Sequence, residues 1–248
     1  MKLAKKFFLI GALISISTML FAQAQSVQKK SSNNETYVEN EYLNDIDSEI
    51  ISGLAESDDL DNKLLALIYI RDAIDEGNTS QGVIEALDKL SGEGVLSESR
   101  TNGRKVNNFP QVRKDACILM AKVPTEHSKN QLISIGISDN EPMVSAAAVQ
   151  SLGIIANADN TDDVIAAVHW INRKYLALNP TSSLAFEVVD AYEKLAPNAS
   201  KNALKLITES LTNIAGESRL SKSVQQRAQK LLKKLANSNS SKNSSDAK

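Results

Sequence analysis

Few side chains in this sequence have spacings that support catalysis or metal binding. The two histidines, His127 and His169, lack the H-x-x-x-H and H-x-x-E spacings that hold zinc. The chain also has no G-x-S-x-G motif, no Walker-type loop and no G-x-G-x-x-G motif. We therefore predict no catalytic residue, no cofactor-binding residue and no metal ligand, and we expect that the protein is not an enzyme.

The single cysteine and the paired carboxylates have structural explanations. Cys117 lies in an apolar stretch, which predicts a buried, unreactive thiol. A nucleophilic role for Cys117 would need a neighbouring base, and the sequence shows none. The pairs Asp58–Asp59 and Asp162–Asp163 come at predicted helix starts, where the positive end of the helix dipole stabilises acidic groups.

One predicted helix, over 161–178, carries side chains suited to binding a partner. Its apolar stripe is expected to face the core and consists of Val164, Val168, Ile171, Tyr175 and Leu178. His169, Trp170 and Arg173 lie away from that stripe, and tryptophan and arginine supply much of the binding energy in protein interfaces. We predict that these three residues form a partner-binding site. The alternative is that Trp170, the only tryptophan, packs sideways against the next repeat.

A basic segment lies near the end of the chain. Between Arg219 and Lys242 there are seven basic residues and no acidic one. The candidate patch consists of Arg227, Lys230, Lys233 and Lys234. Such a patch could bind lipid head groups, an anionic envelope polymer or an acidic protein. The alternative is a solvated cap on the last repeat, since runs of charge usually face water.

Composition favours a helical protein. Hydrophobic residues make up 42% of the chain, enough for a packed interior, whereas aromatic residues make up 4% and Gly and Pro are sparse. The formal net charge of −2 gives no overall indication of nucleic-acid binding, so we expect no nucleic-acid partner.

The N-terminal segment 1–24 is typical of a secretory signal peptide. Lysines are followed by an apolar run from Phe7 to Phe21 and by the small-x-small sequence Ala22-Gln23-Ala24. We expect cleavage after Ala24 and export, with the periplasm as the first expectation and secretion or envelope association as alternatives. A retained signal anchor is a further alternative. No later segment is apolar enough to span a membrane.

The mature chain divides into three parts. Residues 25–38 are polar and predict a flexible leader, and 237–248 predict a disordered tail. Between them, over 39–236, apolar residues recur at steps of three and four, which predicts ten helices. A polar stretch without this period, at about 91–109, predicts an inserted loop. Small or branched residues recur at matching helical positions: Ala66, Ala116, Ala148, Val188 and Ala228.

These repeats resemble the HEAT-repeat family. The matching residues in the third unit are Asp139, Pro142, Val144, Ala148, Leu152 and Gly153, and those in the second unit are Pro110, Val112, Arg113 and Ala116. In the fourth unit, Asn179 replaces the aspartate. The resemblance implies an all-α solenoid of about five antiparallel helical repeats. It also implies that the second helix of each pair lines the concave face, here near 80–90, 126–137, 161–178 and 199–215.

An interaction scaffold or adaptor in the periplasm or cell envelope, with a protein as its main partner, is the function that we expect. One alternative is an enzyme or enzyme subunit of HEAT-like lyase type, because the resemblance includes bilin lyases. A structural subunit of an envelope assembly is the other alternative. Fold alone does not decide among these functions.

Overall fold

The computed structural model describes residues 46–156 and 161–245. The chain divides into two units, Met1–Glu49 and Ile50–Lys248. In the first unit only residues 46–49 are described, and they are helical. The predicted signal peptide and leader therefore lie outside the described residues. The second unit, Ile50–Lys248, is an all-α solenoid, as the sequence predicted.

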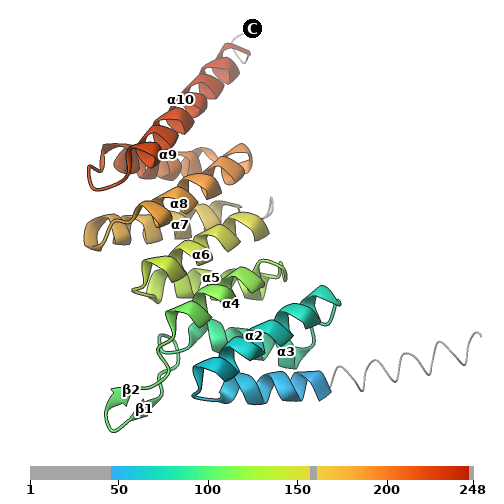
Figure 1. Cartoon of the computed structure of the whole chain (residues 1–248). Helices are drawn as coiled ribbons and strands as arrows, with labels where there is room; N and C mark the ends of the chain where they lie inside the picture. The colour runs from blue at the N-terminus through green and yellow to red at the C-terminus, as the bar shows by residue number, and fades with distance from the viewer. Residues whose placement is uncertain (1–45, 157–160, 246–248) are drawn as a thin grey trace, which may run out of the picture. The chain divides into compact units, whose positions relative to one another are not determined.

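The solenoid consists of short helices in two layers (Figure 1). After a helical segment over 50–56 come α2 Leu60–Asp75, α3 Gln81–Gly92, α4 Pro110–Met120, α5 Glu126–Ser138, α6 Pro142–Ile155, α7 Thr161–Leu178, α8 Ser182–Leu195, α9 Lys201–Gly216 and α10 Lys222–Ser245. A 3-10 turn, Ala196–Asn198, follows α8. The even-numbered helices pack beside one another in one layer, and α3, α5, α7 and α9 form the other. Four helical pairs followed by α10 give the expected number of about five repeats.

Helix boundaries follow the local chemistry of the sequence. The Asp59 carboxylate accepts hydrogen bonds from the backbone N–H groups of Asp61 and Asn62 and so caps α2. Thr125 and Ser200 cap α5 and α9 in the same way. Pro110 and Pro142 begin α4 and α6, where the missing N–H costs no helical hydrogen bond. These caps satisfy backbone donors that would otherwise have no partner within the helix.

The recurring small positions are core positions of the even-numbered helices. All five are fully buried: Ala66, Ala116, Ala148, Val188 and Ala228. Gly153 of α6 allows a close approach within this layer, because a Cβ atom built there would lie 3.1 Å from both Cα and Cβ of Ala191 on α8. Helices α6 and α8 can therefore pack at short range only while residue 153 has no side chain.

A buried ion pair joins successive repeats. Arg113 on α4 donates to Asp139, which precedes α6, through Nε at 2.7 Å and Nη2 at 3.2 Å. Its Nη1 donates to the Glu93 carbonyl and to the Asn108 side chain. The Asp139 carbonyl accepts from the Tyr175 hydroxyl on α7 at 2.9 Å. This network links three successive helical pairs through groups that are almost wholly removed from water.

The predicted inserted loop contains a small β-hairpin. Helix α3 extends to Gly92, and the irregular segment covers 93–109. Within it, β1 Arg100–Thr101 pairs antiparallel with β2 Arg104–Lys105. The turn residues Asn102 and Gly103 have φ of 51° and 78°, as tight hairpin turns require.

Two expectations from the sequence differ from the structure. Helix α10 continues to Ser245, whereas the sequence predicted a disordered tail from residue 237. Ser and Asn have helix propensities only about 0.5 kcal/mol below that of Ala, and adding residues to an established helix is easier than nucleating one. Leu178 was expected in the core but is 74% exposed, because it is the last residue of α7.

No helix in the described part of the chain is long and apolar enough to span a membrane.

Candidate functional site

The outer surface of α7 carries the most exposed aromatic side chain among the described residues. Trp170 is 59% exposed, in contrast to the predicted core residues Val164, Val168, Ile171 and Tyr175, which are buried. This exposure contradicts the alternative in which Trp170 packs sideways against the next repeat.

Arg173 lies beside Trp170 on the same exposed strip. One helical turn separates the two residues, and the Arg173 guanidinium carbon lies 5.5 Å from the centroid of the indole ring. A cation at this distance is attracted by the ring quadrupole, by about 0.5–1 kcal/mol at an exposed site. The pair therefore presents a preordered apolar ring and a positive charge to a partner.

His169 is not part of the exposed surface that the sequence predicted. It is only 6% exposed, and its Nδ1 atom lies 2.9 Å from the Ser210 hydroxyl of α9. The Tyr192 hydroxyl of α8 donates to the same Ser210 oxygen at 3.0 Å. The His169 prediction fails because α7 packs against helices of its own layer as well as the opposite layer. Its buried arc is therefore wider than a single apolar stripe of about 100°.

These hydrogen bonds nevertheless hold the buried His169 ring beside the exposed Trp170 ring. The two rings meet edge to face with their centroids 6.3 Å apart. The site that the structure brings together is thus Trp170 and Arg173 on the surface, with His169 as a buried support.

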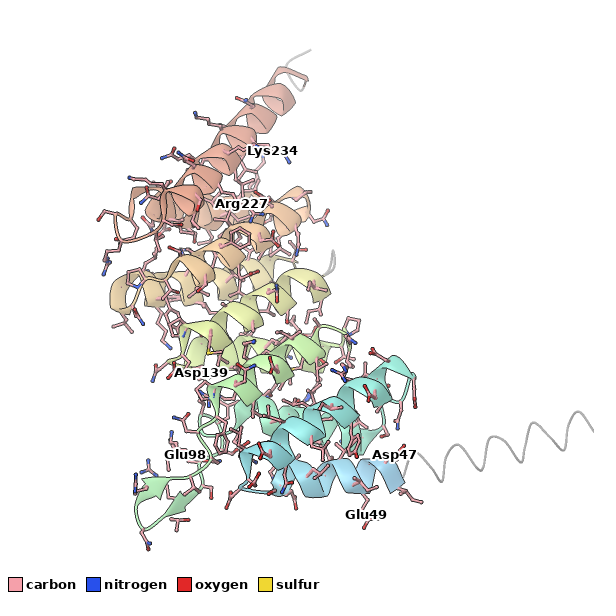
Figure 2. The ribbon with its side chains drawn as sticks, in the orientation of Figure 1. Asp47, Glu49, Glu98, Asp139, Arg227 and Lys234 are labelled. Atoms are coloured by element: carbon pink, nitrogen blue, oxygen red, sulfur yellow. The ribbon has the colours of Figure 1, made fainter. Side chains whose placement is uncertain are left out.

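The predicted basic patch contains one cation that is paired within the protein and three exposed lysines. Arg227 binds Asp190 at 2.7 Å and Glu193 at 2.8 Å, and its guanidinium lies 4.4 Å from the Phe186 ring centroid. Arg227 therefore fastens α10 to α8 and is not a free cation of the patch. The other three members, Lys230, Lys233 and Lys234, are exposed. Figure 2 shows Arg227 and Lys234 along α10.

The carboxylate that binds Arg227 remains ionised. Burial works to raise the pKa of Asp190, but hydrogen bonds from Lys194 and Arg227 outweigh it and hold that pKa below its ordinary value. Arg227 is therefore paired with a charged carboxylate across the pH range in which most proteins fold.

A polar pocket lies between the inserted segment and the α5–α6 turn. Its volume is about 330 Å³, and its charged lining includes Glu98, Lys105, Arg113 and Asp139. Arg113 is bound to Asp139, and Lys105 is bound to Glu98 and to the Gly94 carbonyl. Because these charges pair with one another, we assign the pocket to the joint between repeats. The sequence indicated Arg113 and Asp139 only through their positions in the repeat pattern.

The remaining candidates have structural roles. Cys117 is buried, as predicted, and its burial raises the pKa of its thiol. Asp59 caps α2, and Asp162 and Asp163 lie in the first turn of α7. His127 Nε2 is 2.5 Å from Asp88 on the surface.

Comparisons with known proteins add one structural similarity. No family model and no curated protein matches the chain. The fold is similar to a solved structure of the complex of CpcE and CpcF of phycocyanin lyase from Nostoc sp. PCC7120. The match covers 74% of this chain and 85% of that chain, with 14% identity and a TM-score of 0.37.

This comparison contradicts the prediction that the protein is not an enzyme. The similar structure is that of a lyase, so a helical solenoid of this HEAT-like kind can belong to an enzyme. We withdraw the prediction. At a TM-score of 0.37, the similarity assigns no activity to this chain.

Proposed function

We propose that the protein is an exported interaction scaffold or adaptor that binds a partner protein on the outer surface of the α3–α5–α7–α9 layer. The exposure of Trp170 beside Arg173 is the observation that carries this proposal. Large aromatic side chains are seldom left in water without a function, and such residues dominate the energy of protein interfaces.

The chemistry of the pair suggests what the partner presents. The indole ring offers a flat apolar surface, and the Arg173 guanidinium offers planar donors for a carboxylate. A protein segment with an apolar or aromatic side chain next to Asp or Glu would fit both groups. In HEAT-like solenoids this layer lines the concave side, where an extended partner would lie.

Export and envelope location are part of the proposal. They are supported by the sequence of residues 1–24, which has a basic start, an apolar run and a small-x-small site. Mass spectrometry of protein recovered from the envelope fraction of the source cell tests them. We expect the first residue to be Gln25, and an intact Met1 would contradict cleavage.

Affinity capture with matched variants tests the binding surface. The chain is immobilised as wild type, as Trp170→Ala and as Ile154→Ala, and each is exposed to envelope extract. Ile154 is the control because it is a large apolar residue that is 56% exposed on α6, in the opposite layer. The proposal predicts a protein that wild type and Ile154→Ala retain equally and that Trp170→Ala retains about 30-fold less, which corresponds to about 2 kcal/mol.

Stability of the variants separates binding from folding. Because Trp170 is exposed, its replacement should leave the melting temperature nearly unchanged. If every captured protein binds Trp170→Ala as strongly as wild type, the proposed surface is wrong. A large loss of melting temperature in Trp170→Ala would also contradict the structure on which the proposal rests.

A further inference from the structure

Helix α2 has an apolar outer face that no helix of the described unit covers. Leu65, Ile68 and Tyr69 are 37%, 42% and 43% exposed. Asp61 and Asp72 flank these three residues near the two ends of the same face. Among the described residues, the Asp72 side chain makes a surface contact with Arg71, and exposed pairs of this kind contribute little. This face therefore combines apolar contact area with carboxylates that can accept another cation.

Helix α10 has the complementary face. Its apolar residues Val224, Ala228 and Leu231 are buried against the preceding helices. Helical geometry places Lys222, Lys230 and Lys233 on the opposite side and Lys234 at its edge, and all four are exposed. From residue 218 to Ser245 the chain has seven basic residues and no acidic one.

The beginning of the same unit has the reverse charge. Between residues 50 and 92 there are nine acidic and three basic residues. Most of these acids are exposed, including Asp58, Asp61, Asp72 and Glu76. Helix α2 belongs to the first helical pair and α10 follows the fourth, so the two charged regions lie at opposite ends of the solenoid (Figure 1). They cannot meet within one copy.

We propose that the protein associates head to tail, with the lysine face of α10 in one copy docked on the outer face of α2 in a second copy. The two faces have matching spacing. Asp61 and Asp72 are 11 residues apart, and so are Lys222 and Lys233. Eleven residues make just over three full turns of helix, so each pair lies on one side of its helix and spans about 16 Å. Lys222 and Lys233 can therefore each pair with one of the two carboxylates at the same time, whether the two helices run parallel or antiparallel.

The residues between these charges also fit. The methylene stems of lysines cover apolar surface while their ammonium groups stay in water, which suits Leu65 and Ile68. The face of the Tyr69 ring can receive a further ammonium group. Because the two faces differ, the contact is heterologous, and each copy keeps one free face for a further copy.

Sedimentation velocity of the full chain tests this association. The proposal predicts that the sedimentation coefficient increases with protein concentration at low salt and that the increase is lost at high salt, where exposed charges are screened. A chain that remains monomeric at low salt and high protein concentration overturns the proposal. Binding of monomeric protein to vesicles containing phosphatidylglycerol would also overturn it, by assigning the lysines to lipid.

Charge-reversal variants test the two faces separately. Lys222→Glu with Lys233→Glu should lower the association constant by about tenfold or more, because two attractive pairs become repulsive. The control is Lys201→Glu with Lys205→Glu, which reverses two exposed lysines of α9. Equal loss in the control variant would show that net charge, and not the α10 face, controls association.

A charge swap between two variants tests the proposed contact most directly. Asp61→Lys with Asp72→Lys should weaken association to a similar extent, because both of its faces are then basic. Mixing this variant with Lys222→Glu/Lys233→Glu restores complementary faces, so the mixture should associate more strongly than either variant alone. Ile68→Ser, an exposed change that leaves the charges intact, should weaken association of the otherwise wild-type chain. A mixture that stays monomeric would refute the assigned contact.

Discussion

Removing one partner of the Arg113–Asp139 pair should destabilise the whole solenoid. Both side chains are about 1% exposed, and two hydrogen bonds of 2.7 and 3.2 Å join them. Asp139→Ala leaves the guanidinium buried without its counter-charge, which costs about 3–5 kcal/mol. A domain of ordinary stability unfolds at about 5–15 kcal/mol, so this single change removes a large fraction of the total.

The reverse substitution should cost at least as much. Arg113→Met leaves the Asp139 carboxylate buried and also removes the donors to the Glu93 carbonyl and to Asn108, at 3.1 and 3.0 Å. Combining Arg113→Met with Asp139→Leu removes both charges, so no buried charge remains unpaired. The double variant should therefore lose less stability than the sum of the two single variants, by about 2–3 kcal/mol.

Urea denaturation followed by far-UV circular dichroism measures these free energies of unfolding. The comparison holds only while the slope against urea is the same in all four proteins, since a changed slope indicates loss of cooperativity between repeats. Additive effects of the two single variants would refute the reasoning, because they would show that Arg113 and Asp139 do not interact.

Three further changes test the packing and the electrostatics. Gly153→Ala should lower the free energy of unfolding by about 1–3 kcal/mol, because the new methyl group meets α8. Gly53→Ala should raise the free energy of unfolding by about 0.5 kcal/mol, because a Cβ at residue 53 has nothing within 4 Å. Equal urea midpoints for the two variants would contradict this. Ala148→Asp places a charge at a fully buried position and should unfold the array or cost several kcal/mol, so a wild-type melting curve would refute the repeat alignment. Burial, and then the neighbouring Asp190, raises the pKa of Glu187 above its ordinary value, so its ionisation disfavours the folded state as the pH rises through that pKa. Glu187→Gln should therefore raise the melting temperature slightly at pH 7 and leave it unchanged near pH 4, and the opposite pattern would contradict the sign.

The fold could be predicted because its signal is repeated along the chain. Ala116, Ala148 and Val188 mark the same helical position in successive repeats, and all three are buried as expected. The helix starts also follow from local chemistry, as at Asp59 and Pro142. The extent of α10 was not predictable in this way, because Ser and Asn neither strongly favour nor forbid a helix.

The candidate site was predicted only in part. A single helical stripe correctly placed Trp170 and Arg173 outside the core, but it could not show that α9 covers His169. Likewise, the run of lysines gave no sign that Arg227 binds two acids on α8, since those partners are more than 30 residues away in sequence. Residues whose environment depends on the neighbouring repeat require the three-dimensional packing.

Fluorine NMR on Trp170 tests the central claim most directly. Because Trp170 is the only tryptophan, labelling the protein with fluorotryptophan gives one resonance that reports on this surface alone. We expect that this resonance shifts or broadens when the captured envelope protein is added, and that the Ile154→Ala variant responds in the same way. If the captured protein binds while the resonance stays unchanged, the partner occupies another surface and the proposed function of Trp170 is wrong.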